Sequence, residues 1–103
     1  MAFIEIGGCR YPRVVIKWKD IIGAGGFADL QESRELVCPS MVTEGYLFDV
    51  FEEDGERYVR TFASYQISDE AAFADRNCIP FSVLSKESKR DVEIALMFMN
   101  HEG

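Results

Sequence analysis

An Asp54-Gly55 step between two long stretches of alternating apolar and charged residues constrains the fold of this chain more than any other feature. Asp-Gly favours the type I′ turn, whose twist matches that of two antiparallel strands. If Glu53 faces Glu56, the opposed residues form complementary cross-strand pairs: Glu52 with Arg57, Phe51 with Tyr58, Val50 with Val59, Asp49 with Arg60 and Leu47 with Phe62. We therefore predict a hairpin over residues 41–67. Both of its faces carry apolar residues, which indicates a central position in a strongly bent sheet.

A second strand is predicted before this hairpin. Residues 13–19 alternate between apolar and basic side chains, and Val14, Ile16 and Trp18 fall on one face. A glycine-rich bend at residues 23–26 follows, and residues 29–37 favour a short helical turn that ends before Cys38-Pro39. The long loop after the first strand should thus carry one short helix.

The last third of the chain predicts one more strand, over Phe73 to Ile79, and a tight turn over Phe81 to Leu84. The tail is ambiguous, because residues 88–91 resemble a capping box at a helix start, whereas residues 92–98 alternate as a strand does. We favour a strand for the tail, since a small barrel needs a fifth strand to close.

The predicted fold class is mainly β: a small SH3-like or Sm-like five-stranded barrel with a short helical turn in the long loop. A chain of 103 residues with 48% apolar residues has room for one such domain, residues 1–103, with its ordered core over residues 12–99.

Composition excludes several function classes. A net charge of −7 argues against binding to duplex nucleic acid, which requires a basic surface. The longest apolar run, Ile94 to Met99, is far shorter than a bilayer span, so no membrane association is expected. The N-terminal sequence lacks a signal peptide's basic and apolar regions, and the odd, widely spaced Cys9, Cys38 and Cys78 indicate reduced thiols. These features predict a cytoplasmic protein.

No motif for catalysis withstands inspection. Residues 23–28 match the glycine pattern of dinucleotide-binding proteins, but the crossover helix and parallel strands that this pattern requires do not follow. His101 is the only histidine and lies at the C-terminal end, and no cysteine or serine has a neighbouring base. The acidic residues 49–56 are best explained as a solvated hairpin tip. We expect no enzymatic activity, no metal and no cofactor.

One set of aromatic and charged residues falls at strand ends and loops. Aromatic rings that sandwich a base, an arginine on a phosphate and an aspartate on base or ribose groups would together bind one nucleotide-like molecule. The candidate residues are Trp18, Asp20, Phe27, Asp29, Tyr46, Arg60, Tyr65, Arg76 and Asn77. Packing in the core and loops is the alternative explanation of the same residues, and the commoner one.

Five short motifs together resemble those of small uncharacterised proteins of bacteriophages and prophages. They are Trp18-x-Asp20, Gly26-Phe27, Cys38-Pro39-Ser40, Gly45-Tyr46-Leu47 and Asn77-x-Ile79-Pro80-x-x-Val83, within residues 14–84. That family has tryptophan where this chain has Phe27, a shorter spacing between the cysteine and the glycine, and no apolar C-terminal extension.

The resemblance implies a small β-barrel from a mobile element that acts as a counter-defence or host-takeover factor in the host cytoplasm, by capturing a small nucleotide signal or a host protein. The alternative is a structural or assembly accessory protein that only oligomerises. Self-association is expected in either case, because six successive apolar residues, 94–99, cannot all face one small core.

Overall fold

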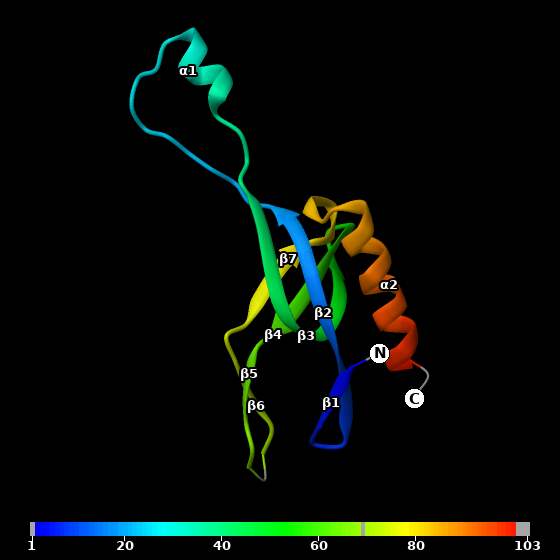
Figure 1. The fold of residues 1–103 in the computed structure, drawn as a ribbon. Coiled ribbons are helices and arrows are strands. Elements are labelled where there is room, and N and C mark those ends of the chain that lie inside the picture. Colours follow the sequence, from blue (N-terminus) through cyan, green and yellow to red (C-terminus); the bar gives the residue numbers. More distant parts are fainter. Residues whose placement is uncertain (1, 69, 101–103) are drawn as a thin grey trace.

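The computed structural model describes residues 2–68 and 70–100 and shows a mainly β protein (Figure 1). A five-stranded antiparallel sheet has the strand order β1-β2-β3-β4-β7, and β5 and β6 form a separate two-stranded hairpin. The elements are β1 (Phe3–Ile6), β2 (Cys9–Lys19), α1 (Leu30–Glu35), β3 (Ser40–Glu53), β4 (Glu56–Phe62), β5 (Ser64–Gln66), β6 (Ala72–Ala74), β7 (Asn77–Pro80), the 3₁₀ turn η1 (Phe81–Val83) and α2 (Lys86–Asn100).

The predicted Asp54-Gly55 hairpin is confirmed as β3 and β4. Asp54 and Gly55 both have positive φ, 52° and 80°, as a type I′ turn requires. Glu52 faces Arg57 and Val50 faces Val59, as expected. An irregularity at Phe48 then shifts the register by one residue, so Leu47 faces Thr61 and the predicted Leu47–Phe62 pair is wrong.

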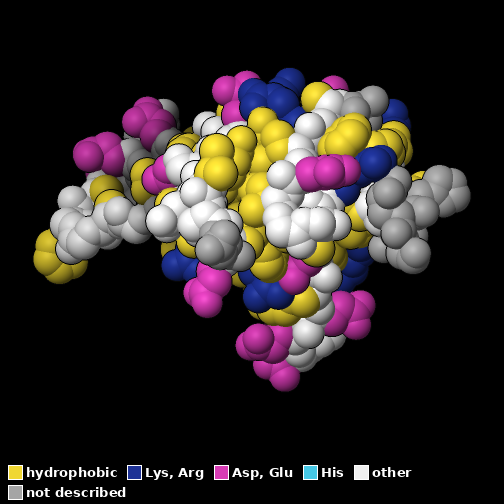
Figure 2. Space-filling view, turned by 90° about the horizontal axis from the view of Figure 1, so that it is seen from below, with side chains coloured by type: hydrophobic (Ala, Val, Ile, Leu, Met, Phe, Trp, Pro, Cys, Tyr) yellow, Lys and Arg dark blue, Asp and Glu magenta, His cyan; other side chains and the backbone are white. Residues whose placement is uncertain are grey.

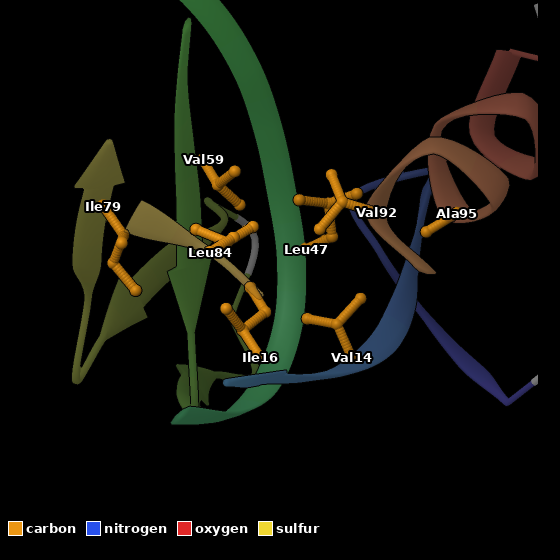
Figure 3. Close-up of a cluster of buried hydrophobic side chains, with 8 residues drawn as sticks. All are labelled: Val14, Ile16, Leu47, Val59, Ile79, Leu84, Val92 and Ala95. Carbon is orange, nitrogen blue, oxygen red and sulfur yellow. The ribbon is translucent and has the colours of Figure 1, made fainter. Parts of the chain in front are cut away.

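One hydrophobic core lies between the sheet and α2 (Figure 3). The alternation in β2 is confirmed: Val14 and Ile16 are buried, and Trp18 packs against the same cluster while its Nε1 donates to Thr43 Oγ1 (2.9 Å). The eight buried side chains of the core come from every long element: Val14, Ile16, Leu47, Val59, Ile79, Leu84, Val92 and Ala95.

The prediction of a strand for the tail is wrong, because residues 86–100 form the helix α2 along the sheet. Ser85 begins it: its Oγ accepts the Ser88 N–H (3.1 Å). Ser88 is buried, and its Oγ accepts the backbone N–H of Lys17 in β2 (2.7 Å). Burial then follows the helical spacing of Val92 and Ala95, which leaves Ile94 and Met97 exposed.

The single strand predicted over residues 73–79 is also wrong. Asp75 adopts a positive φ of 53° and divides the segment into β6 and β7. β6 pairs with β5, whereas β7 pairs with β4 through contacts such as Ile79 opposite Val59. The turn after Pro80 is confirmed as η1.

The fifth strand is β1, which precedes the expected ordered core and pairs with β2 across Gly7 and Gly8, both at positive φ. Strand pairing in the described residues does not close the sheet into a barrel. The chain after β7 does return to β2, because Leu84 forms a single bridge with Trp18 and the Ser85 N–H donates to the Lys17 carbonyl (2.9 Å).

Residues 20–39, which we call the arm, project away from the sheet between β2 and β3 (Figure 1). The predicted helical turn is present in the arm as α1, and the glycine-rich stretch before it is loop. The molecule measures 56 × 27 × 27 Å and has a radius of gyration of 16.8 Å, against about 13 Å for a compact chain of this length. The arm at one end and the β5–β6 hairpin at the other make the molecule elongated (Figure 1).

Candidate functional sites

The arm exposes an unusual number of large apolar side chains. Phe27 is fully exposed, Ile21 is 87% exposed and Leu30 is 67% exposed. Six such residues lie within this one segment: Ile21, Ile22, Phe27, Leu30, Leu36 and Val37. A cluster of exposed apolar residues on a protein surface usually marks a contact site.

The ends and the helix of the arm are held by hydrogen bonds. The Asp20 N–H donates to the Pro39 carbonyl (3.0 Å), which closes the base of the arm beside the sheet. Asp29 caps α1, because its Oδ1 accepts the Glu32 N–H (2.8 Å). Asp20 Oδ1 accepts the following N–H, from Ile21 (2.8 Å). Both predicted ligand-binding aspartates therefore shape the arm.

The arm is acidic as well as apolar. It contains four carboxylates and one guanidinium, from Asp20, Asp29, Glu32, Glu35 and Arg34. Beside its base, a groove of about 330 Å³ is lined by Trp18, Met41 and Leu84, with Lys17 and Lys19 at its edge. Trp18 thus belongs to the core and to this groove.

A second candidate site is a hollow of about 750 Å³ where the β5–β6 hairpin leaves the sheet. Phe48, Phe62 and Phe73 form its apolar wall, and the Phe62 and Phe73 ring centroids are 4.8 Å apart. Its polar lining residues are Arg60, Thr61, Asp75, Arg76 and Asn77. Asp75 accepts a hydrogen bond from Ser64 Oγ, which fixes the corner between β6 and β7.

The polar groups of the hollow differ in how they are engaged. Arg60 binds Asp49 through two hydrogen bonds, of 2.6 and 2.5 Å, and its guanidinium lies 4.2 Å from the centre of the Phe51 ring. The hydrogen bond that Arg60 donates to Asp49 is the main cause that raises the pKa of Arg60. Arg76 has no ion-pair partner within residues 2–68 and 70–100. The buried Thr61 Oγ1 likewise lacks a hydrogen-bond partner there.

The structure divides the nine predicted ligand residues between the two ends of the molecule. Trp18, Asp20, Phe27 and Asp29 lie in the arm or at its base, whereas Arg60, Arg76 and Asn77 line the hollow. Tyr46 stacks on Phe62 (5.6 Å between centroids), and Tyr65 is half-exposed on β5. A single site built from all nine residues is therefore excluded.

Sequence reasoning missed the aromatic wall of the hollow, Phe48, Phe62 and Phe73, and the polar lining residues Thr61 and Asp75. Phe48 sits at the register shift of β3, and no local signal in the sequence predicts that irregularity. The exposure of the apolar residues of the arm could have been predicted. Ile21-Ile22 and Leu36-Val37 lie on either side of the glycine-rich loop and short helix, outside any predicted strand.

Near the hollow, Tyr11 is buried, and its ring centroid lies 5.6 Å from that of Phe73. Burial is the main cause that raises the pKa of Tyr11, with smaller contributions from Cys9 and Asp49. Tyr11 therefore stays protonated well into alkaline solution.

Other chemistry is sparse in the parts of the chain that the structure describes. Cys9, Cys38 and Cys78 are free and exposed. Over residues 2–68 and 70–100, no three side chains of His, Cys, Asp or Glu are grouped as a metal site would need. His101 lies outside the described residues. Within those residues, no helix has the length and apolar character to cross a membrane.

Comparison of the chain with protein-family models, curated proteins and solved structures finds no match.

Proposed function

We propose that this protein is a non-enzymatic binding protein that engages a partner protein through the arm. The observation that carries the proposal is the concentration of six exposed large apolar side chains on one protruding segment whose base is fixed to the sheet. Full burial of one such side chain contributes about 1.5–3 kcal/mol. Burying several of them would offset the cost of association and support at least micromolar affinity.

The charge of the arm specifies the chemistry of that partner. The arm carries four carboxylates against the single cation of Arg34, so the complementary surface is an apolar groove with a basic rim. The phage-family resemblance supports a role as a counter-defence or host-takeover factor, in which case the partner is a host protein in the host cytoplasm.

A structural accessory that only oligomerises is the second candidate function. The observation in its favour is that Ile94 and Met97 are exposed on α2, within the apolar stretch expected to join a subunit interface. Light scattering at micromolar concentration separates the candidates. A mass near 11.7 kDa leaves the arm free for a partner, whereas a larger mass that reverts on Phe27→Ser would show that the arm binds a second copy and would overturn the host-protein proposal.

The binding test compares two matched variants. Phe27→Ser removes the most exposed ring of the arm, and Ile67→Ser removes an equally exposed apolar side chain outside it. A protein captured from host extract by the wild type is purified and titrated against all three proteins in calorimetry. We expect Phe27→Ser to weaken binding by about tenfold or more, as for the loss of one large anchor, and Ile67→Ser to bind like the wild type. Equal binding by both variants would refute the role of the arm.

The charge argument has its own measurement. Affinity for the captured protein should fall as salt is raised from 50 to 300 mM, roughly by severalfold, because salt screens exposed charges. The double variant Glu32→Gln, Glu35→Gln should remove much of this salt dependence. An affinity that rises with salt would contradict a basic rim on the partner.

The barrel class also remains a proposal. The return of the chain to β2 through the Trp18–Leu84 bridge supports a partly open form of the SH3-like or Sm-like barrel, with α2 packed along the sheet (Figure 1). Hydrogen exchange tests it: the Ser85 N–H should be as protected as the amides of β2.

A further inference from the structure

From the hollow beside the β5–β6 hairpin we infer a second site, independent of the arm, that binds a singly charged cyclic nucleoside monophosphate. A cavity volume of about 750 Å³ falls within the range of small-molecule sites, about 300–1,000 Å³. The hollow faces away from the arm, because its lining comes from the lower ends of β4 and β7 and from β6 (Figure 1). Figure 2 shows that end of the molecule, where apolar side chains gather among charged ones.

The wall of the hollow suits a planar base. Phe48 and Phe73 line it with partly exposed rings, and the Phe62 ring, only 1% exposed, packs edge to face behind them, with centroids between 4.8 and 6.4 Å apart. Aromatic surface of this kind stacks on any nucleobase without hydrogen-bond specificity. Asn77 lies on the same lining and supplies an amide, which can donate to and accept from the edge of a base.

The charge of the hollow selects a monoanion. Arg60 is already neutralised by Asp49 through a bidentate pair, so it is not a free cation. Arg76 supplies a guanidinium without a carboxylate partner in the described part of the chain. The carboxylate of Asp75 and the net charge of −7 repel polyanions. A cyclic phosphodiester with one negative charge therefore fits better than a nucleoside triphosphate.

The test is calorimetric titration of the full chain with 3′,5′-cyclic AMP, GMP, CMP and UMP. Adenosine, inorganic phosphate and ATP serve as comparison ligands. Adenosine carries the base without a charge, inorganic phosphate carries the anion without a base, and ATP carries excess negative charge. We expect a cyclic monophosphate to bind at least tenfold more tightly than any of these three, since only it combines the base with a single charge. Absence of saturable binding by all four cyclic nucleotides at millimolar concentration would overturn the site.

Two variants locate the binding. Arg76→Gln should weaken it about tenfold or more, through loss of a charge-assisted hydrogen bond, whereas Arg90→Gln on α2 should leave it unchanged. Binding that survives Arg76→Gln would refute the assignment. Phe27→Ser should not alter nucleotide binding, so the proposal for this site and the proposal for the arm can be refuted independently.

Discussion

Leu47 in β3 is fully buried, whereas Leu30 in α1 has 67% of its surface exposed. The same contrast runs through the two regions that they represent. Side chains of the sheet and α2 converge on one core (Figure 3). Those of the arm are exposed to solvent, although many of them are equally apolar. Folding of this chain therefore depends on the sheet, and the apolar residues of the arm contribute little to it. That division leaves the apolar residues of the arm available for the partner contact that we propose.

The largest effect should come from exchanging the two leucines for alanine. Leu47→Ala leaves a cavity in the core and should lower the free energy of unfolding by about 2–5 kcal/mol. Leu30→Ala removes the same atoms from an exposed site and should change it by less than about 0.5 kcal/mol. Urea denaturation followed by circular dichroism measures both. A loss above about 1 kcal/mol for Leu30→Ala would show that the arm packs against the body in solution.

Two glycines offer the next comparison. A Cβ added at Gly45 in β3 would lie 2.5 Å from the Phe62 carbonyl oxygen, whereas one added at Gly23 in the arm would meet nothing within 4 Å. Gly45→Ala should therefore cost about 1–3 kcal/mol by forcing the two strands apart. Gly23→Ala should be neutral, or stabilise by up to about 1 kcal/mol through the unfolded state.

Thermal melts of the two glycine variants decide the point. If Gly45→Ala melts at the same temperature as the wild type, β3 and β4 are farther apart at Gly45 than in the structure.

The sequence predicted those parts of the sheet where local chemistry acts alone. The Asp54-Gly55 turn and the charge pairs beside it set the hairpin register correctly as far as Asp49. The shift at Phe48 was not predictable, because it depends on how β3 fits between its two neighbours in the sheet, β2 and β4. Helix α1 was predictable from Asp29 and the residues after it, since its cap is local.

The tail shows how an argument about the whole fold can override a correct local signal. The predicted cap at residues 88–91 and the spacing of Val92 and Ala95 favour a helix, yet the demand for a fifth strand favoured a strand. The structure places the cap three residues earlier, at Ser85. The N-terminal Gly7-Gly8 turn already supplied that strand as β1. The prediction of the ligand site was wrong for a similar reason. Residues at strand ends were grouped as one site, although the topology places them at opposite ends of the molecule.

The loss of stability at alkaline pH should also arise in the sheet, which contains Tyr11, and not in the arm, which contains no tyrosine. The pKa of Tyr11 is raised in the native state, chiefly by burial. The unfolded chain thus ionises first, at a pKa of about 10. The contribution of Tyr11 is fully present below that pH and is lost as the pH rises toward the higher native pKa. Urea midpoints between pH 8 and 11 should fall more steeply for the wild type than for Tyr11→Phe, and parallel curves would contradict the shift.

The smallest effect on global stability should come from removing the cap of α1. Asp29 and Ser85 play the same role, because each accepts the backbone N–H three residues later at the start of a helix. Helix α2 is packed on the core, so Ser85→Ala should cost about 1 kcal/mol of unfolding free energy. Helix α1 has six residues, none of them buried, and a helix this short is marginal without packing.

Asp29→Ala should therefore unwind α1 and abolish the exchange protection of the Glu32 amide, while the melting temperature stays within about 1 °C, since exposed sites barely affect global stability. If it instead lowers the melting temperature as much as Ser85→Ala does, the arm folds cooperatively with the sheet. The two regions would then be one unit, and arm residues could not be assigned to binding by their exposure alone.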